Sequence, residues 1–121
     1  MPTIKNRQLI EEYEVHRGAT ITADETSEWF NCEGFHNLRL NLSVIGTVSG
    51  TSPTLDVTVE IVGRTHGDAF TDLGGMTQIT ATSASESKLF DIRGVSYFRI
   101  KTNVGGTSPS FGDTDLIFAL E

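Results

Sequence analysis

The sequence predicts an all-β protein, an antiparallel β-sandwich of jelly-roll-like form with eight or nine short strands and an N-terminal arm. Three observations support this fold class. Four stretches alternate apolar and polar residues with the two-residue period of a strand that has one face in the core. Turn residues separate these stretches at short intervals. No apolar repeat of helical period and length follows residue 17, and short strands at such spacing favour a sandwich over alternating strands and helices.

The chain has 121 residues, which suits one domain. We expect residues 18–121 to form a single β-sandwich domain and residues 1–17 to form an N-terminal arm or tail. The arm is either a loosely ordered tail or a segment that becomes ordered against a partner. Either Tyr13 and Val15 belong to an edge strand, or the apolar side chains of the arm line one short helical stripe, made of Ile4, Leu9, Ile10 and Tyr13. These four residues are candidate partner contacts.

The first half of the domain contains two strongly predicted strands. Two weaker candidates come first, at residues 19–23 and 28–30. Residues 38–44 then alternate strictly, and every second side chain is apolar: Leu38, Leu40, Leu42 and Val44. Residues 55–61 follow the same rule, with an inward set of Leu55, Val57, Val59 and Ile61. One-sided alternation is typical of an antiparallel sheet with one face in water.

The second half of the domain contains the other two strongly predicted strands. Three weaker candidates precede or separate them, at residues 70–73, 77–81 and 88–92. Residues 97–104 alternate and are expected to bury Phe98, Ile100 and Val104. The last predicted strand, residues 116–120, is expected to bury Leu116, Phe118 and Leu120.

An internal repeat is the most distinctive feature of the sequence. Gly50-Thr-Ser-Pro-Thr54 recurs as Gly106-Thr-Ser-Pro-Ser110, 56 residues later, and the flanking apolar positions align as well. Glycine permits backbone angles that other residues avoid, and proline cannot donate a ladder hydrogen bond. We therefore expect two similar strand–loop–strand hairpins with their loops at the same end of the domain. Alternatively, the two loops share only generic turn chemistry.

The second copy departs from the first after Phe111. Asp113 and Asp115 stand at positions where the first copy has apolar side chains, and the alternation then resumes one residue out of phase. A β-bulge at Gly112 would absorb this shift, or residues 111–115 form a longer loop. We expect a contact specific to this protein at the acidic break, so Asp113 and Asp115 are also candidate partner contacts.

Charge and composition exclude several classes of protein. The formal net charge of −7 and the isoelectric point near 4.8 argue against a nucleic-acid binder, which needs clustered basic residues. Residues 1–15 lack the apolar run of a signal peptide, and no stretch approaches the roughly 20 apolar residues of a membrane span. The single cysteine, Cys32, cannot form an internal disulfide and suits a reducing compartment. We expect a protein made in a cytoplasm and not secreted, without membrane or nucleic-acid partners.

The residues give no support to catalysis or cofactor binding. No serine stands in a Gly-x-Ser-x-Gly context, and Cys32 has no second thiol to share a metal. Asp113 and Asp115 make up half of a calcium loop at most, and a solvated acidic loop is the simpler interpretation. The three histidines are far apart in sequence, at His16, His36 and His66. We expect no metal, no cofactor and no enzymatic activity.

Aromatic residues leave two interpretations open. They form a platform for a carbohydrate, or they pack at the edge of the sandwich, where large rings supply much of a small core. The residues concerned are Trp29, Phe30, Phe35 and Tyr97.

The segments 38–61 and 97–111, with the Trp-Phe pair at residues 29–30, resemble a group of small β-rich virion proteins from tailed bacteriophages. The resemblance covers roughly residues 28–111 and departs at residues 112–115, where relatives more often continue an apolar alternation. It rests on structural segments and not on a functional site.

The resemblance implies a function. Members with an assigned role are mostly head decoration or cement proteins, β domains that bind the finished lattice of the major capsid protein, often as trimers. We therefore expect a structural virion protein of this type that forms a homo-oligomer, with a trimer favoured. The alternative is a tail- or baseplate-associated protein or a carbohydrate-binding β-sandwich module.

Overall fold

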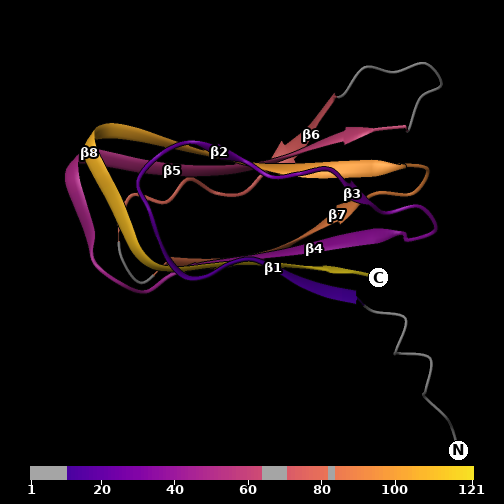
Figure 1. Cartoon of the computed structure of the whole chain (residues 1–121), viewed down its shortest axis with the longest axis horizontal. Helices are drawn as coiled ribbons and strands as arrows, with labels where there is room; N and C mark the ends of the chain where they lie inside the picture. Colours follow the sequence, from indigo (N-terminus) through magenta and orange to yellow (C-terminus); the bar gives the residue numbers. More distant parts are fainter. Residues whose placement is uncertain (1–10, 64–70, 82–83) are drawn as a thin grey trace, which may run out of the picture.

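A computed structural model describes residues 11–63, 71–81 and 84–121, and all of its strands belong to one antiparallel sheet that folds over itself (Figure 1). No helix occurs in these three segments. The all-β antiparallel prediction is confirmed. Eight strands lie in the described residues: β1 (Glu11–Ile21), β2 (Glu25–Thr26), β3 (Phe30–Asn31), β4 (Asn37–Val44), β5 (Val48–Val62), β6 (Thr71–Gly75), β7 (Ala84–Asp91) and β8 (Tyr97–Leu120).

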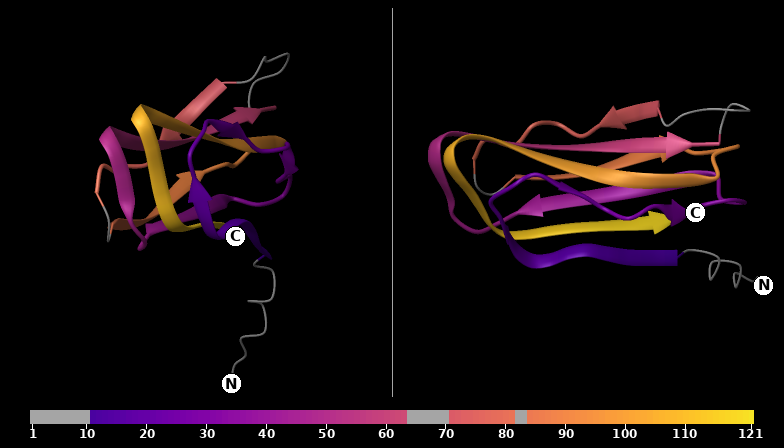
Figure 2. Two further views of the ribbon diagram at one scale, coloured as in Figure 1. Left: turned by 60° about the vertical axis from the view of Figure 1, so that its left-hand side comes forward. Right: turned by 45° about the horizontal axis from the view of Figure 1, so that its top comes forward.

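The folded sheet has two layers, because β8 takes part in both. Residues 97–104 of β8 pair with β5, and the short strands β2 and β3 also pair with this half. Residues 114–120 of β8 pair with β4 on one side, and β1 lies on the other. The β5 layer is therefore β6–β5–β8 with β2 and β3, and the β4 layer is β7–β4–β8–β1. Figure 2 shows the two layers and the residues that follow β1 crossing between them at one side.

The core lies between the layers and follows the predicted alternation. In β4 every second residue is buried, with Leu38, Leu40, Leu42 and Val44 at most 1% exposed. The inward sides of β5 and β8 complete the core, including the three fully buried rings of Phe98, Phe111 and Phe118. All four strongly predicted stretches are strand, but residues 97–104 and 116–120 belong to the single strand β8. The burial follows the predicted alternation except at Val104, which is only partly buried.

The weaker candidates differ in their outcome. The candidates at 28–30, 70–73 and 88–92 lie at or beside β3, β6 and β7. The candidate at 77–81 forms only an isolated bridge between Ile79 and Leu55. The candidate at 19–23 is the end of a longer strand, β1, which ends at Ile21.

The repeated segments form a paired corner at the end of the sandwich where β5 and β8 pass from one layer to the other (Figure 1). Gly50 and Gly106 have φ of 110° and 101°, and Ser52 and Ser108 both have φ of 50°. The two copies therefore share one backbone conformation. The expectation of two hairpins is wrong, since each copy is a single bent strand and the two copies pair with each other. The expectation that the two repeated segments lie at the same end of the domain is confirmed.

The pairing register gives the repeat an approximate two-fold symmetry. Val48 faces Phe111, and Leu55 faces Val104. Moving the first pair by the repeat offset of 56 residues produces the second pair with the partners exchanged. Each copy thus supplies the partner of the other, which explains why the sequence repeats at the corner.

A second repeated unit lies at the opposite end of the sandwich. The Glu33 N–H donates to Oδ1 of Asn31 (2.9 Å), and the Arg93 N–H donates to Oδ1 of Asp91 (3.0 Å). The two turns also bond to each other, because Cys32 N–H donates to the Ser96 carbonyl and Ile92 N–H donates to the His36 carbonyl, both at 2.9 Å. The corresponding sequence repeat is Phe-Asx-x-x-Gly, at residues 30–34 and 90–94.

The predicted boundary between an N-terminal arm and the domain, after residue 17, falls inside strand β1. β1 runs from Glu11 to Ile21 and pairs with β8 over most of that length, so residues 11–17 are an edge strand of the β4 layer. Tyr13 faces Phe118 in this ladder. Of the two alternatives for Tyr13, the structure shows the edge strand and excludes the helical stripe. Ile4, Leu9 and Ile10 lie outside the described residues.

The acidic break contains the predicted bulge. Asp113 has φ of 48°, and β8 continues through it without interruption. Its carbonyl accepts a hydrogen bond from Ile45 N–H (3.3 Å), while Gly112 carbonyl accepts one from Gly46 N–H (3.0 Å). The extra residue returns the alternation to phase, so that Thr114 and Leu116 are both buried. The longer loop is therefore excluded.

Candidate functional site

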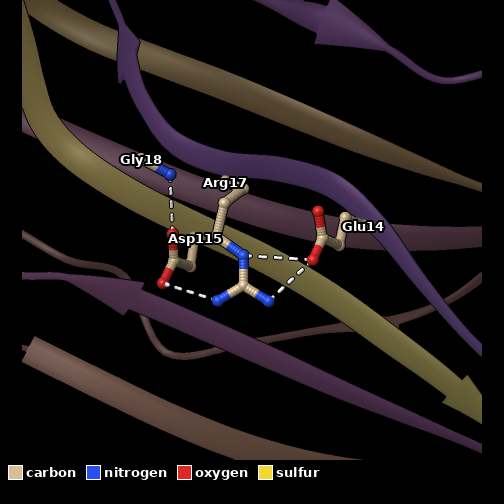
Figure 3. Close-up of polar contacts among 4 residues, drawn as sticks. All are labelled: Glu14, Arg17, Gly18 and Asp115. Atoms are coloured by element: carbon tan, nitrogen blue, oxygen red, sulfur yellow. Dashed lines mark hydrogen bonds and ion pairs between the residues drawn. The ribbon is translucent and has the colours of Figure 1, made fainter.

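Asp115 is held against β1 by a charged cluster (Figure 3). The Gly18 N–H donates to its Oδ1 at 2.7 Å, and Arg17 Nη1 lies 3.8 Å from its Oδ2. Arg17 also donates to Oε2 of Glu14 through Nη2 (2.7 Å) and Nε (3.1 Å). Gly18 has φ of 64°, so its amide turns out of the regular ladder and needs another acceptor. Asp115 supplies that acceptor.

Asp113 lies beside this cluster. Its side chain is exposed, and its Oδ1 would be 3.6 Å from a Cβ placed on Gly18. Asp113 and Asp115 therefore flank the same irregularity of β1. The structure gives Asp115 a bonding role within the chain, and it leaves the carboxylate of Asp113 at the surface.

Tyr13 connects the surface to an aromatic cluster of the core. Its ring is 5.0 Å from Phe118 and 6.4 Å from Phe30, and it is 42% exposed. Phe30 lies 5.3 Å from Phe98 and 4.9 Å from Phe118. These rings close the side of the sandwich between β1 and β3, with Tyr13 at its surface.

The charged residues that β4 and β8 present on the outer face of the β4 layer are paired. We call this surface the β4 face, and register and burial assign to it Arg39, Asn41 and Ser43 of β4, Ser85, Ser87 and Leu89 of β7, and Asp115, Ile117 and Ala119 of β8. Its centre is the row Ser87, Asn41 and Ile117. Arg39 is paired with Glu121 (2.8 Å) and Asp115 with Arg17. By register, Glu12 and Glu14 of β1 border this face beside Ala119 and Ile117, and Glu14 is paired with Arg17 (2.7 Å).

Such a surface can pack against another protein at small electrostatic cost. Hydroxyl and amide groups at its centre donate and accept hydrogen bonds, and Leu89, which is 48% exposed, adds apolar area. No single stretch of the sequence predicts this face. The signal was present in the outward positions of residues 38–44 and in Ser85 and Ser87, but only the strand order shows that they are neighbours.

Of the two interpretations of the aromatic residues, the contacts of Trp29, Phe30 and Phe35 favour packing over a carbohydrate platform. The Arg99 guanidinium lies 4.5 Å above the ring of Trp29, and Arg99 Nε donates to Oε1 of Glu60 at 2.7 Å. One face of Trp29 is thus covered by a cation. Phe30 and Phe35 pack partly buried against the core. Trp29 and Tyr97 are 37% and 41% exposed, so some aromatic surface stays open.

The remaining candidates for chemistry have structural surroundings. Cys32 is fully buried, and burial, helped by the charge of Glu33, raises the pKa of its thiol to about 11. His16 Nε2 lies 2.7 Å from Oε1 of Glu25 and joins β1 to β2. Within residues 11–63, 71–81 and 84–121, no group of three or more histidine, cysteine or acidic side chains is placed to hold a metal. In the same segments no helix is long and apolar enough to cross a membrane.

Comparison with known proteins gives a likeness of fold. No protein-family model matches the chain, and no curated protein matches its sequence. The SPBc2 prophage-derived protein YomS superimposes with a TM-score of 0.55 at 17% identity, covering 92% of this chain and 91% of that one. A chain from infectious bursal disease virus, Gx strain, gives a TM-score of 0.52 at 11% identity, covering 92% of this chain and 31% of the viral one. This chain therefore has a fold that also occurs in a prophage-derived protein and in a virus structure.

Proposed function

We propose that this chain is a structural protein of a bacteriophage virion, and that it binds the assembled head as a decoration or cement protein. The observation that carries the proposal is the likeness of fold to a prophage-derived protein along nine-tenths of both chains. The coarse function, a structural virion protein, agrees with the phage resemblance of residues 28–111. The finer role, head decoration, rests on that resemblance and on the β4 face.

The β4 face is the proposed contact with the major capsid protein lattice. Its paired charges and neutral centre suit a broad surface that must lie against another protein, although the chain as a whole is acidic. A protein that binds the assembled lattice and not the free subunit stabilises the lattice by mass action. A symmetric oligomer, with a trimer favoured, would add avidity to weak individual contacts.

The test places a large charge at the centre of the β4 face. Asn41→Arg should abolish cosedimentation with mature heads, because the guanidinium would be desolvated without a partner in the contact. Asn103→Arg is the matched control, since Asn103 is an exposed residue of the β5 layer. Both variants should keep the native circular dichroism spectrum and melting temperature within a few degrees.

The proposal fails if neither the native chain nor Asn103→Arg binds heads. Binding of the native chain to purified tails in place of heads would favour the tail-associated alternative. Equal binding by Asn41→Arg and the native chain would reject the β4 face as the contact while leaving the decoration role in place.

The arm can be tested separately, provided that the deletion stops before β1. Removal of residues 2–17 would take away most of an edge strand, whereas removal of residues 2–10 leaves β1 intact. If the arm contributes to lattice or subunit contacts, the shorter deletion should weaken head binding without changing the fold. Unchanged head binding would remove residues 2–10 from the proposed contact.

The carbohydrate-binding alternative has one specific observation in its favour, the exposed ring area of Trp29 and Tyr97. A glycan array that shows binding by the native chain and loss of binding by Trp29→Ala would favour this role. Because Arg99 covers one face of Trp29, we expect no binding above background.

A further inference from the structure

An open pocket of about 420 Å³ lies at the end of the sandwich opposite the paired corner, lined by Glu33, Gly34, Phe35, His36 and Glu121. The Glu121 carbonyl accepts hydrogen bonds from the backbone N–H of His36 (2.8 Å) and of Asn37 (3.0 Å). Leu120, the residue before Glu121, faces Glu11 at the start of β1. The pocket therefore opens beside the point where the chain enters the sheet.

The lining suits a peptide with apolar and basic side chains. Phe35 is partly buried against the core and supplies an apolar surface. At Gly34 no atom lies within 4 Å of the position of a Cβ, so a bound backbone can approach closely. Glu33 is exposed and adds a carboxylate, and the carboxylate of Glu121 is held in place by Arg39 at 2.8 Å.

The charge of the chain is divided unevenly between residues 1–10 and the remainder. Residues 1–10 contain Lys5 and Arg7 and no acidic residue, which gives +2. The whole chain has a net charge of −7, so residues 11–121 carry −7 − 2 = −9. Two folded bodies with this charge repel each other, whereas residues 1–10 of one copy and the body of another attract.

We propose that residues 1–10 of one copy bind in this pocket of a second copy, with Lys5 and Arg7 toward the carboxylates of Glu33 and Glu121 and with apolar side chains on Phe35. Residues 1–10 can span up to about 33 Å when extended, enough to reach a neighbouring molecule. The pocket of the same copy lies beside the start of β1, so the experiment has to separate binding between copies from binding within one copy.

This contact goes beyond the proposed function, because it joins copies of the chain, and it meets the β4 face only at the Arg39–Glu121 pair. It predicts self-association that weakens with salt, since an exposed contact between opposite charges is screened. Each copy both donates a segment and offers a pocket. The contact can therefore link copies head to tail around a closed ring.

The experiment is a charge exchange in the full-length chain, measured by sedimentation velocity. Arg7→Glu and Glu33→Arg should each weaken self-association by about two- to fivefold, and the double variant should recover at least the native affinity. Asp56→Arg is the control for the change of net charge, because Asp56 lies in β5 close to the corner end. It should not reduce association.

Three results would overturn the proposal: a native chain that is monomeric at every concentration, single variants that associate like the native chain, or a double variant that does not recover. A monomeric native chain would include the case in which residues 1–10 bind the pocket of their own copy. Head binding by the native chain and by Asn41→Arg tests the proposed function separately, because neither protein carries a substitution in residues 1–10 or in the pocket.

Discussion

At the scale of single residues, Asp115 was predicted to contact a partner, and the structure shows it bonded within its own chain. The sequence marked it because an acid interrupts an apolar alternation. In the folded chain its carboxylate accepts the Gly18 N–H at 2.7 Å and lies within 3.8 Å of Arg17. The interruption is therefore explained by the irregular pairing of β1 with β8, without any external partner.

Removing this acceptor should loosen β1. We expect Asp115→Ala to lower the free energy of unfolding by about 1 kcal/mol, since a hydrogen bond to a charged group at a partly exposed site is lost. Asp115→Asn keeps a carbonyl oxygen for Gly18 N–H and should cost roughly half as much. Glu14→Ala removes only an exposed ion pair and should stay within about 0.5 kcal/mol.

Chemical denaturation of the three variants measures these differences. Equal costs for Asp115→Ala and Glu14→Ala would show that the bond to Gly18 N–H contributes nothing to stability.

Because of Cys32, the free energy of unfolding should fall at alkaline pH. The pKa of the Cys32 thiol is raised from 9.0 to about 11 in the folded chain, so the folded state disfavours the thiolate. The contribution is fully present below the unfolded pKa and is lost as the pH rises through the folded pKa. Relative to Cys32→Ala, the native chain should therefore lose on the order of 2 kcal/mol between pH 8.5 and pH 11.

Denaturation of both proteins across this range of pH measures the loss. A constant difference between them would contradict the buried, neutral thiol.

At the scale of elements, the sequence predicted the strands well and their partners poorly. The alternation in residues 38–44 or 55–61 is a local property, so it identifies strands and inward side chains. Pairing is not local, and a repeated Gly-Thr-Ser-Pro segment suits a hairpin loop and a bent strand equally. The hairpin expectation failed because nothing within residues 50–54 indicates that they pair with residues 105–107.

The paired corner predicts equal effects in its two copies. A Cβ on Gly50 would lie 2.6 Å from the Ser108 carbonyl oxygen, and one on Gly106 would lie 2.5 Å from that of Ser52. Gly50→Ala and Gly106→Ala should therefore each cost at least about 3 kcal/mol, from backbone strain together with the clash. Gly34→Ala is the control, since Gly34 also has positive φ, at 91°, but has open space around it.

Gly34→Ala should cost only the strain, about 1–2 kcal/mol. Thermal denaturation of the three variants provides the comparison. A cost at Gly50 or Gly106 no larger than at Gly34 would contradict the close pairing of the corner.

At the scale of the whole molecule, the candidate site was partly predictable. Tyr13, Asp113 and Asp115 all belong to the β1–β8 pair, but Tyr13 is in register with the buried Phe118 and Asp115 with Ser43 on the outward side, so their role as partner contacts stays a prediction. The β4 face could not be found from the sequence, because its residues come from β4, β7 and β8 and become neighbours only through the strand order. The boundary at residue 17 was misplaced because an edge strand with three glutamates has little apolar pattern.

Binding to a lattice should also change the stability of the lattice. If the chain binds assembled heads and not free capsid protein, saturating amounts should raise the melting temperature of heads, with an effect that grows with the logarithm of its free concentration. Differential scanning calorimetry of heads with and without the chain measures this effect. Asn41→Arg should produce none, and an equal rise with that variant would exclude the β4 face.

The central claim, a structural role on the phage head, is tested most directly by electron cryomicroscopy of particles that contain the chain. A decoration protein should give density of the two-layer fold on the outside of the head, at symmetry-related lattice positions, with the β4 face toward the capsid. Density confined to the tail or baseplate, or particles that lack the chain altogether, would contradict this claim.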